Sequence, residues 1–154
     1  MQEQVTERMV IRGSLDHCFA VLIDFELYPE WAADIKAVAV EERDAEGRPV
    51  RVTFRAAAFG RSTSYTLLYD YAEAPGRLSW IQVAGDLTRR LDGAYVLEPA
   101  GDDATEIRYD LVVELKVPLP GFVKRRAEGR IMGTALRELR ARVEHEEEPL
   151  REPR

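Results

Sequence analysis

The most constraining feature of this sequence is a regular alternation of apolar and polar residues that leads directly into a long helical pattern. Every second residue from 107 to 117 is apolar or aromatic, namely Ile107, Tyr109, Leu111, Val113, Leu115 and Val117. A period of two residues is typical of a strand with one buried face in an antiparallel sheet. After a break at residues 118–121, apolar residues recur at helical spacing to about His145. The pattern therefore predicts a final strand followed by a long C-terminal helix, whose apolar stripe comprises Phe122, Ile131, Met132, Ala135, Leu136, Leu139 and Val143.

The preceding residues predict further strands and two short helices. Residues 5–12 alternate weakly, as an edge strand does, and Ser14 is a natural N-cap for a following helix. Pro29 suits the first turn of a second short helix. Turns rich in glycine, proline and charge then separate five strands that precede the final one. We predict an α+β fold in which a curved antiparallel sheet of about seven strands wraps the long helix, with two short helices after the first strand.

The same patterns set the expected domain organisation. No internal repeat or linker divides the chain, so residues 1–147 are expected to form a single ligand-binding domain. Residues 148–154 are charged and interrupted by prolines, and we expect them to be a disordered tail.

Composition excludes several classes of protein. The chain has 22 Lys and Arg against 28 Asp and Glu, and its net charge of -6 argues against nucleic acid as a partner. No apolar signal segment and no run of about 20 apolar residues is present, which predicts a cytoplasmic protein without integral membrane association. His17 and His145 are expected to be exposed and Cys18 to be core packing. These residues form no spaced ligand set, so we expect no metal and no cofactor. Monomer and homodimer both remain open.

A sheet wrapped around one helix leaves room for a cavity. Only the C-terminal helix is long enough to lie across the sheet, and it carries small residues at Gly129, Gly133 and Ala135. The two glycines have two interpretations, retained space or the close approach of a neighbouring element.

Aromatic residues on the predicted inner faces are candidates for contacts with a ligand, because their rings are apolar and their tips are polar. On the helix, Glu128 and Arg125 are expected at the cavity mouth, where Arg125 would meet an anionic or carbonyl group and Glu128 would pair with it. The alternative for the aromatic residues is that they only fill the core. The alternative for the two charged residues is a solvated surface pair. Strand parity leaves the direction of Trp80 open. The candidate ligand-binding residues are Phe54, Tyr65, Leu67, Tyr69, Trp80, Tyr95, Tyr109, Leu111, Phe122, Arg125, Glu128, Met132, Ala135 and Leu136. No residue is singled out as catalytic.

A basic cluster at the start of the predicted helix has two interpretations. It is either a solvated helix face or a site of transient contact with an anionic membrane. The cluster and its apolar neighbours are Lys124, Arg125, Arg126, Arg130, Leu119 and Phe122.

Several short motifs occur in an order that resembles a known family. They are Ser14 to Phe25, Tyr28-Pro29-Glu30-Trp31, Gly76-Arg77-Leu78-Ser79-Trp80, Gly85-Asp86, Asp92-Gly93-Ala94-Tyr95, Thr105 to Tyr109 and Leu119-Pro120-Gly121-Phe122. Together they resemble the polyketide cyclase/dehydrase branch of the START-like (SRPBCC) superfamily over residues 5–147, and are similar to its coenzyme Q-binding proteins. The resemblance implies the helix-grip fold with a deep hydrophobic cavity between sheet and helix.

The resemblance also implies a class of function. The expected function is binding, with transport or sequestration, of a hydrophobic small molecule such as a polyketide, an isoprenoid or quinone, or a lipid. One alternative is a polyketide aromatase/cyclase that uses cavity Tyr or Arg groups as acid catalysts. Another is a protein interaction module with no native ligand.

Overall fold

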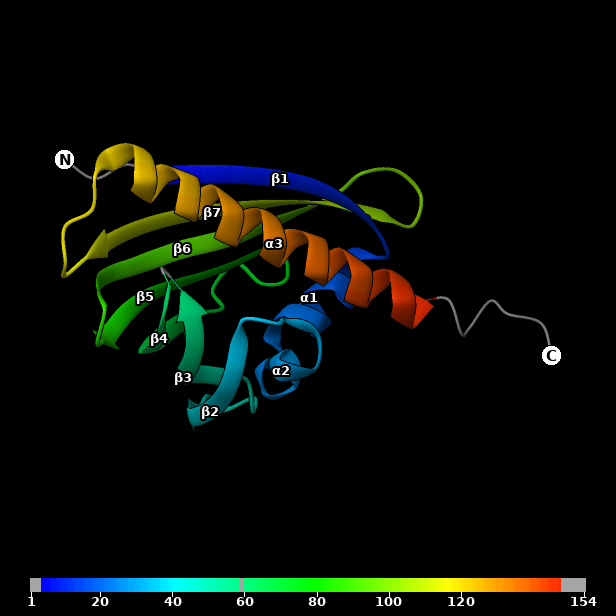
Figure 1. The fold of residues 1–154 in the computed structure, drawn as a ribbon. Coiled ribbons are helices and arrows are strands. Elements are labelled where there is room, and N and C mark those ends of the chain that lie inside the picture. The colour runs from blue at the N-terminus through cyan, green and yellow to red at the C-terminus, as the bar shows by residue number, and fades with distance from the viewer. Residues whose placement is uncertain (1–3, 59, 148–154) are drawn as a thin grey trace.

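The computed structural model describes residues 4–58 and 60–147 and contains the predicted elements in the predicted order (Figure 1). The predicted tail at residues 148–154 lies outside the described residues. In chain order the elements are β1 (Gln4–Arg12), α1 (Leu15–Ile23), the short 3-10 helix η1 (Phe25–Leu27), α2 (Tyr28–Trp31), β2 (Ile35–Arg43), β3 (Pro49–Ala58), β4 (Arg61–Asp70), β5 (Arg77–Gly85), β6 (Thr88–Pro99), β7 (Ala104–Leu115) and α3 (Gly121–Glu147).

The seven strands form one antiparallel sheet in the order β1-β7-β6-β5-β4-β3-β2. Strands that follow each other in the chain are neighbours, except that β1 pairs with β7 and so lies at an edge, as expected. The sheet curves, and α3 lies across it, with α1 and α2 beneath the C-terminal half of α3 (Figure 1). The predicted α+β helix-grip architecture is confirmed.

Helix α1 is capped at its start and packs against the core and α3. Ser14 Oγ accepts a hydrogen bond of 3.1 Å from the backbone N–H of His17, which satisfies a free donor at the helix start. Cys18 is fully buried, as expected for packing. The prediction that His17 is exposed is wrong, because its side chain is only 24% exposed and its Nε2 lies 2.9 Å from Glu146 Oε1 on α3.

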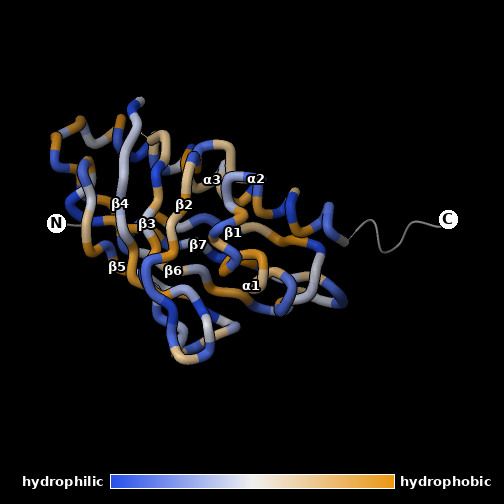
Figure 2. The backbone as a smooth tube through the Cα atoms, turned by 90° about the horizontal axis from the view of Figure 1, so that it is seen from below, coloured by the Kyte–Doolittle hydropathy of each residue, from blue (hydrophilic) through white to orange (hydrophobic). Residues whose placement is uncertain are grey.

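The buried face of α3 begins later than the sequence predicts. Hydrophobic and hydrophilic residues alternate along this helix (Figure 2), but Phe122 in its first turn is 64% exposed. Residues 116–123, through which the chain passes from β7 into α3, are all exposed. The inward face of α3 starts with Glu128, which is 2% exposed.

The two glycines of α3 do not mark a close approach of another element. A Cβ atom at Gly129 would meet nothing within 4 Å, and one at Gly133 would meet only Arg137 of the same helix, at 3.2 Å. The close-packing interpretation is therefore wrong for both positions. Neither glycine lines the cavity between the sheet and α3.

Candidate ligand-binding site

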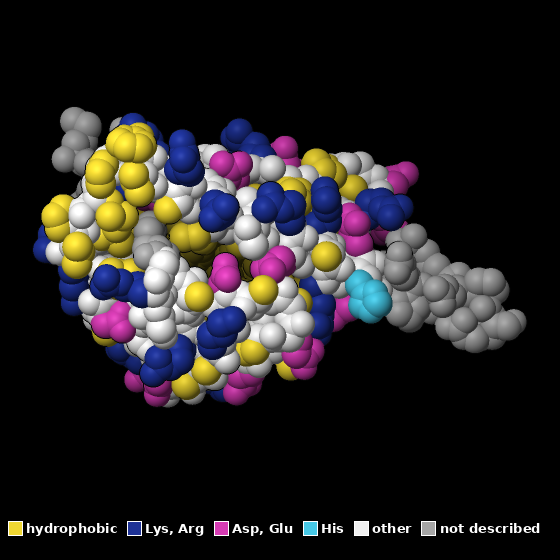
Figure 3. All heavy atoms as spheres, in the orientation of Figure 1, with side chains coloured by type: hydrophobic (Ala, Val, Ile, Leu, Met, Phe, Trp, Pro, Cys, Tyr) yellow, Lys and Arg dark blue, Asp and Glu magenta, His cyan; other side chains and the backbone are white. Residues whose placement is uncertain are grey.

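A cavity of about 160 Å³ lies between the inner face of the sheet and α3. Its walls come from β2 to β7 together with α2 and α3, so residues far apart in the chain enclose it. Figure 3 shows its opening as a recess with hydrophobic side chains inside and acidic side chains at the rim. Among the described residues that line the cavity none is Lys or Arg, whereas three are carboxylates, Asp34, Glu128 and Glu138.

Cross-strand pairing assembles an aromatic wall on the sheet. The ladder places aromatic residues directly opposite each other on neighbouring strands, and their ring centroids lie 4.5 to 5.7 Å apart. Such pairs stabilise a sheet beyond the area that they bury. The pairs are Phe54 with Tyr65, Tyr69 with Trp80, and Tyr95 with Tyr109.

Trp80 points inward, which settles the direction that strand parity left open. Its side chain is 6% exposed, and it pairs across β5 and β6 with Gly93. A Cβ atom at Gly93 would lie 2.7 Å from Trp80 Cζ2 and would also collide with the carbonyl oxygen of Asp110. Only glycine lets the indole lie across β6 here. Trp80 Nε1 is buried without a hydrogen-bond partner in the part of the chain that the structure describes.

Tyrosine hydroxyls are among the polar groups of the cavity wall. Tyr28 donates a hydrogen bond of 2.6 Å to the carbonyl oxygen of Leu22, and the ring centroids of Tyr95 and Tyr109 lie 4.5 Å apart. For Tyr65 and Tyr69, residues 4–58 and 60–147 supply no hydrogen-bond partner to the hydroxyl. Two hydroxyls of the cavity wall are therefore available to a guest.

Burial keeps these phenols neutral. Desolvation raises the pKa of Tyr28, Tyr65, Tyr69, Tyr95 and Tyr109 well above the ordinary value, because the phenolate is poorly solvated in an apolar wall. Each hydroxyl therefore keeps its proton at neutral pH, so it can donate a hydrogen bond as well as accept one.

Glu128 is a buried carboxylate on the α3 side of the cavity. It accepts a hydrogen bond of 2.7 Å from Lys124 Nζ one helical turn earlier, and this ion pair offsets the cost of burying its charge. Sequence reasoning expected Arg125 as its partner, but the structure places Lys124 in that role. Arg125 is exposed and does not line the cavity.

The structure brings most of the predicted site residues together. Those that line the cavity are Phe54, Tyr65, Leu67, Tyr69, Trp80, Tyr95, Tyr109, Leu111, Glu128 and Ala135. The other four lie elsewhere: Phe122 and Arg125 are exposed, whereas Met132 and Leu136 are buried in a neighbouring, solid part of the core. The cause is the rotation of α3, since its cavity-facing stripe runs one residue out of phase with its largest aliphatic residues. Contact of the ten lining residues with a ligand remains a prediction.

Sequence reasoning missed other lining residues. Helical spacing from Glu128 and strand parity with Tyr65 and Tyr95 would have identified Ile131, Thr134, Glu138, Thr63 and Leu91. No local signal identifies the residues that α2 and the turns bring over the cavity. The full set of missed residues is Tyr28, Trp31, Ala32, Asp34, Ile35, Ala58, Thr63, Leu87, Thr88, Leu91, Val113, Ile131, Thr134 and Glu138.

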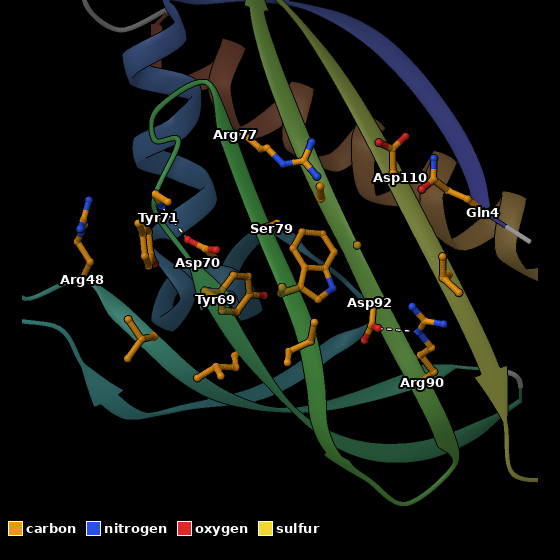
Figure 4. Close-up of a pocket in the computed structure, with 18 of the residues that line it drawn as sticks. Gln4, Arg48, Tyr69, Asp70, Tyr71, Arg77, Ser79, Arg90, Asp92 and Asp110 are labelled. Carbon is orange, nitrogen blue, oxygen red and sulfur yellow. Dashed lines mark hydrogen bonds and ion pairs between the residues drawn. The ribbon is translucent and has the colours of Figure 1, made fainter. Parts of the chain in front are cut away.

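A second hollow, of about 760 Å³, lies on the outer face of the sheet (Figure 4). It is larger, but its charged side chains already satisfy one another. Arg90 Nε lies 2.6 Å from Asp92 Oδ2, and the mostly buried Asp110 accepts hydrogen bonds from Thr6 and Arg108. An open groove with paired charges excludes little water, so the enclosed inner cavity is the better candidate site.

Within residues 4–58 and 60–147, no group of three or more His, Cys, Asp or Glu is placed to hold a metal ion. No helix in the described part of the chain is long and apolar enough to cross a bilayer.

Solved structures share this fold over nearly the whole chain. A START superfamily protein from Mycobacterium smegmatis is 26% identical with a TM-score of 0.88, covering 94% of this chain and 99% of that chain. The ZhuI aromatase/cyclase from Streptomyces sp. R1128 is 12% identical with a TM-score of 0.81, covering 94% of each chain. A protein from Thermus thermophilus is 21% identical with a TM-score of 0.76, covering 92% of this chain and 97% of that chain.

Comparison with curated proteins gave no match. A family model described as "Polyketide cyclase / dehydrase and lipid transport" matches residues 11–140, which span most of the sheet and α3. The helix-grip architecture, the enclosed aromatic cavity and this match agree. The chain therefore belongs to the polyketide cyclase/dehydrase and lipid transport family of the START-like superfamily.

Proposed function

We propose that the protein binds a neutral, hydrophobic, ring-containing small molecule in the cavity between the sheet and α3. The observation that carries this proposal is an apolar aromatic wall with two hydroxyls, of Tyr65 and Tyr69, that have no partner within the described residues. Sites for small molecules combine apolar surface with a few placed polar groups. The guest would stack on the rings and accept or donate hydrogen bonds at these hydroxyls.

The size of the cavity limits how much of the guest lies inside it. A volume of about 160 Å³ holds a group of about one or two aromatic rings. A polyketide, a prenylated quinone or a lipid would place one end in the cavity and extend through the opening seen in Figure 3. The cavity therefore recognises a head group or terminal ring rather than the whole molecule.

Charge around the cavity selects against anions. The three lining carboxylates repel a negative group, and the pairing of Lys124 with Glu128 offsets only one of their charges. Glu138 also accepts a hydrogen bond of 3.2 Å from the backbone N–H of Ala33, which links α3 to the turn before β2 at the rim. A neutral guest is therefore favoured over a free fatty acid or another carboxylate.

The cyclase alternative has less support in the site. That mechanism uses cavity Tyr or Arg groups as acids, and Arg125 lies outside the cavity. Burial raises the pKa of the cavity tyrosines, which makes them weaker proton donors. We therefore propose binding without assigning a reaction.

Native mass spectrometry with a matched pair of variants tests the proposal. Ala135 lines the cavity, whereas Ala141 is exposed on the same helix, so Ala135→Phe fills the cavity and Ala141→Phe adds the same ring outside it. The wild type and Ala141→Phe should retain a stoichiometric apolar adduct that organic extraction recovers, and Ala135→Phe should lose it. An adduct that persists equally in Ala135→Phe would contradict the proposal.

Two probes on one scaffold test the charge preference. N-phenyl-1-naphthylamine is neutral, and 1-anilinonaphthalene-8-sulfonate adds a sulfonate to the same rings. The neutral probe should bind about tenfold more tightly or better, because the acidic rim repels the sulfonate. If neither probe binds and no adduct is found, the cavity is core space and an interaction module without a native ligand is the better explanation.

A further inference from the structure

The segment that joins β7 to α3 gathers exposed apolar side chains at one end of the molecule. The described part of the chain exposes seven large hydrophobic side chains, and four of them lie within residues 117–123. These four are Val117, Leu119, Phe122 and Val123. Phe122 is the most exposed of all seven, at 64%. Exposed apolar residues are ordinary when scattered, but a contiguous group marks an interaction site.

Positive charge surrounds this apolar group. Residues 115–127 contain no Asp or Glu, although the whole chain has a net charge of -6. Figure 3 shows hydrophobic side chains gathered with Lys and Arg at the end of the molecule where α3 begins. We call the whole set the basic apolar patch, and it comprises Val117, Leu119, Phe122, Val123, Lys116, Lys124, Arg125, Arg126 and Arg130.

The basic apolar patch contacts the cavity wall at two places, on the sheet side and on the α3 side. The backbone N–H of Lys116 donates a hydrogen bond of 2.9 Å to the carbonyl oxygen of Leu87, which lines the cavity from the turn between β5 and β6. Lys124 contacts Glu128, the carboxylate of the α3 wall, at 2.7 Å. Two residues of the basic apolar patch are therefore in direct contact with residues of the cavity wall.

We propose that the basic apolar patch docks on an anionic lipid surface. Basic side chains around a short exposed apolar segment match such a surface in charge, and the apolar side chains match the headgroup boundary beneath. Docking draws Phe122 and Leu119 into the boundary while Arg126 and Arg130 contact lipid phosphates. The further step, exchange of the guest between cavity and bilayer, rests on the proposed function, whereas docking itself does not.

Co-sedimentation with vesicles tests docking without any ligand. The purified chain should bind vesicles of phosphatidylcholine with phosphatidylglycerol, bind phosphatidylcholine alone far more weakly, and detach as salt is raised. Arg126→Gln and Arg130→Gln should each weaken binding about fivefold. Phe122→Ser should weaken it about tenfold through lost apolar burial.

Matched controls separate the basic apolar patch from the rest of the surface. Arg140→Gln removes an exposed arginine further along α3, and Ile81→Ser removes a 52% exposed hydrophobic residue on β5. Both should bind the anionic vesicles like the wild type. Equal losses in the controls, or no vesicle binding by the wild type, would overturn the proposal.

Two more measurements distinguish the possible failures. If Phe122→Ser or the arginine variants abolish a dimer seen by analytical ultracentrifugation, the patch is a protein interface and the lipid proposal is wrong. Binding of N-phenyl-1-naphthylamine in solution should be unchanged in the patch variants. If the wild type binds this probe but not the vesicles, the docking proposal is wrong and the proposed function stands. If Ala135→Phe still binds the vesicles, docking does not depend on the cavity.

Discussion

Two stripes of α3 face the interior, and they differ in chemistry although they differ in phase by a single residue. Met132, Leu136, Leu139 and Val143 are each at most 1% exposed and belong to the solid core, where α3 packs against β1, α1 and β7. The other stripe faces the cavity and is formed by Glu128, Ile131, Ala135 and Glu138. Large aliphatic side chains fill the first stripe, whereas the second combines Ile131 with one small and two charged residues and borders open space.

One helix therefore both closes the core and retains space. The solid stripe supplies the stability, because close-packed aliphatic residues bury the most apolar area. The cavity stripe faces tyrosines whose rings are packed but whose hydroxyls at Tyr65 and Tyr69 have no partner among the described residues. Variants of the solid stripe should therefore change folding, and variants around the cavity should change binding.

The largest expected effect is alkaline unfolding driven by the cavity tyrosines. Burial raises the pKa of all five, so above pH ~10 the folded protein holds more protons than the unfolded chain. Each can remove up to ~1.4 kcal/mol of stability per pH unit in that range, and domains have only about 5–15 kcal/mol. Stability should be unaffected below pH ~9 and lost between pH ~10 and ~12.

Absorbance of tyrosinate and circular dichroism check this together. In the folded protein the tyrosinate signal should stay low and then rise in one cooperative step with the loss of near-ultraviolet dichroism. In urea the same chain should titrate smoothly near pH ~10. Smooth titration near pH ~10 with native dichroism intact would show that the tyrosines are open to water.

The second largest effect should come from the solid stripe. Leu139→Ala leaves a cavity among residues that cannot collapse onto it, at a cost of about 3 kcal/mol in the free energy of unfolding. Ile131→Ala enlarges a cavity that already exists, and Ile131 is partly exposed, so its cost should be about 1 kcal/mol. Urea denaturation measures both. Equal costs would mean that the two stripes are packed alike.

The contrast between the stripes also explains what the sequence could predict. Periodicities of two and of 3.6 residues identified the strands, the order of elements and α3, because burial of one face determines each pattern. Strand parity placed Tyr65, Tyr69 and Tyr109 on the cavity side. Met132 and Leu136 were misassigned because an error of one residue rotates a helix by about 100°.

Other parts of the site depend on tertiary contacts that no local pattern encodes. Tyr28 and Trp31 reach the cavity because α2 folds over it, and Asp34 follows in the next turn. The exposure of Phe122 depends on where α3 first meets the sheet, although its residue type favours burial. Sequence patterns therefore predict the layers well and the rim of the cavity poorly.

A smaller effect is expected at Gly129, beside the cavity stripe. A Cβ atom there meets nothing within 4 Å, and alanine favours helix over glycine by about 1 kcal/mol. Gly129→Ala should therefore raise the free energy of unfolding by up to about 1 kcal/mol and leave probe binding unchanged. Destabilisation on urea denaturation would show that the position has a close neighbour after all.

The smallest effect on stability, and the most specific effect on binding, should come from Tyr69→Phe. The change removes a hydroxyl that has no partner among the described residues and keeps the ring that packs on Trp80, so stability should stay within about 0.5 kcal/mol. Affinity for 1,4-naphthoquinone should fall about five- to tenfold through the lost hydrogen bond, whereas affinity for naphthalene should not change. Both tryptophans line the cavity, so quenching of their fluorescence reports binding.

Tyr71→Phe is the matched control for this test, because its hydroxyl donates a hydrogen bond of 2.5 Å to the carbonyl oxygen of Pro49, outside the cavity. This control should show the reverse pattern, a loss of about 1 kcal/mol in stability with unchanged affinity for both guests. If Tyr69→Phe binds both guests like the wild type, the Tyr69 hydroxyl does not contribute to recognition of the quinone.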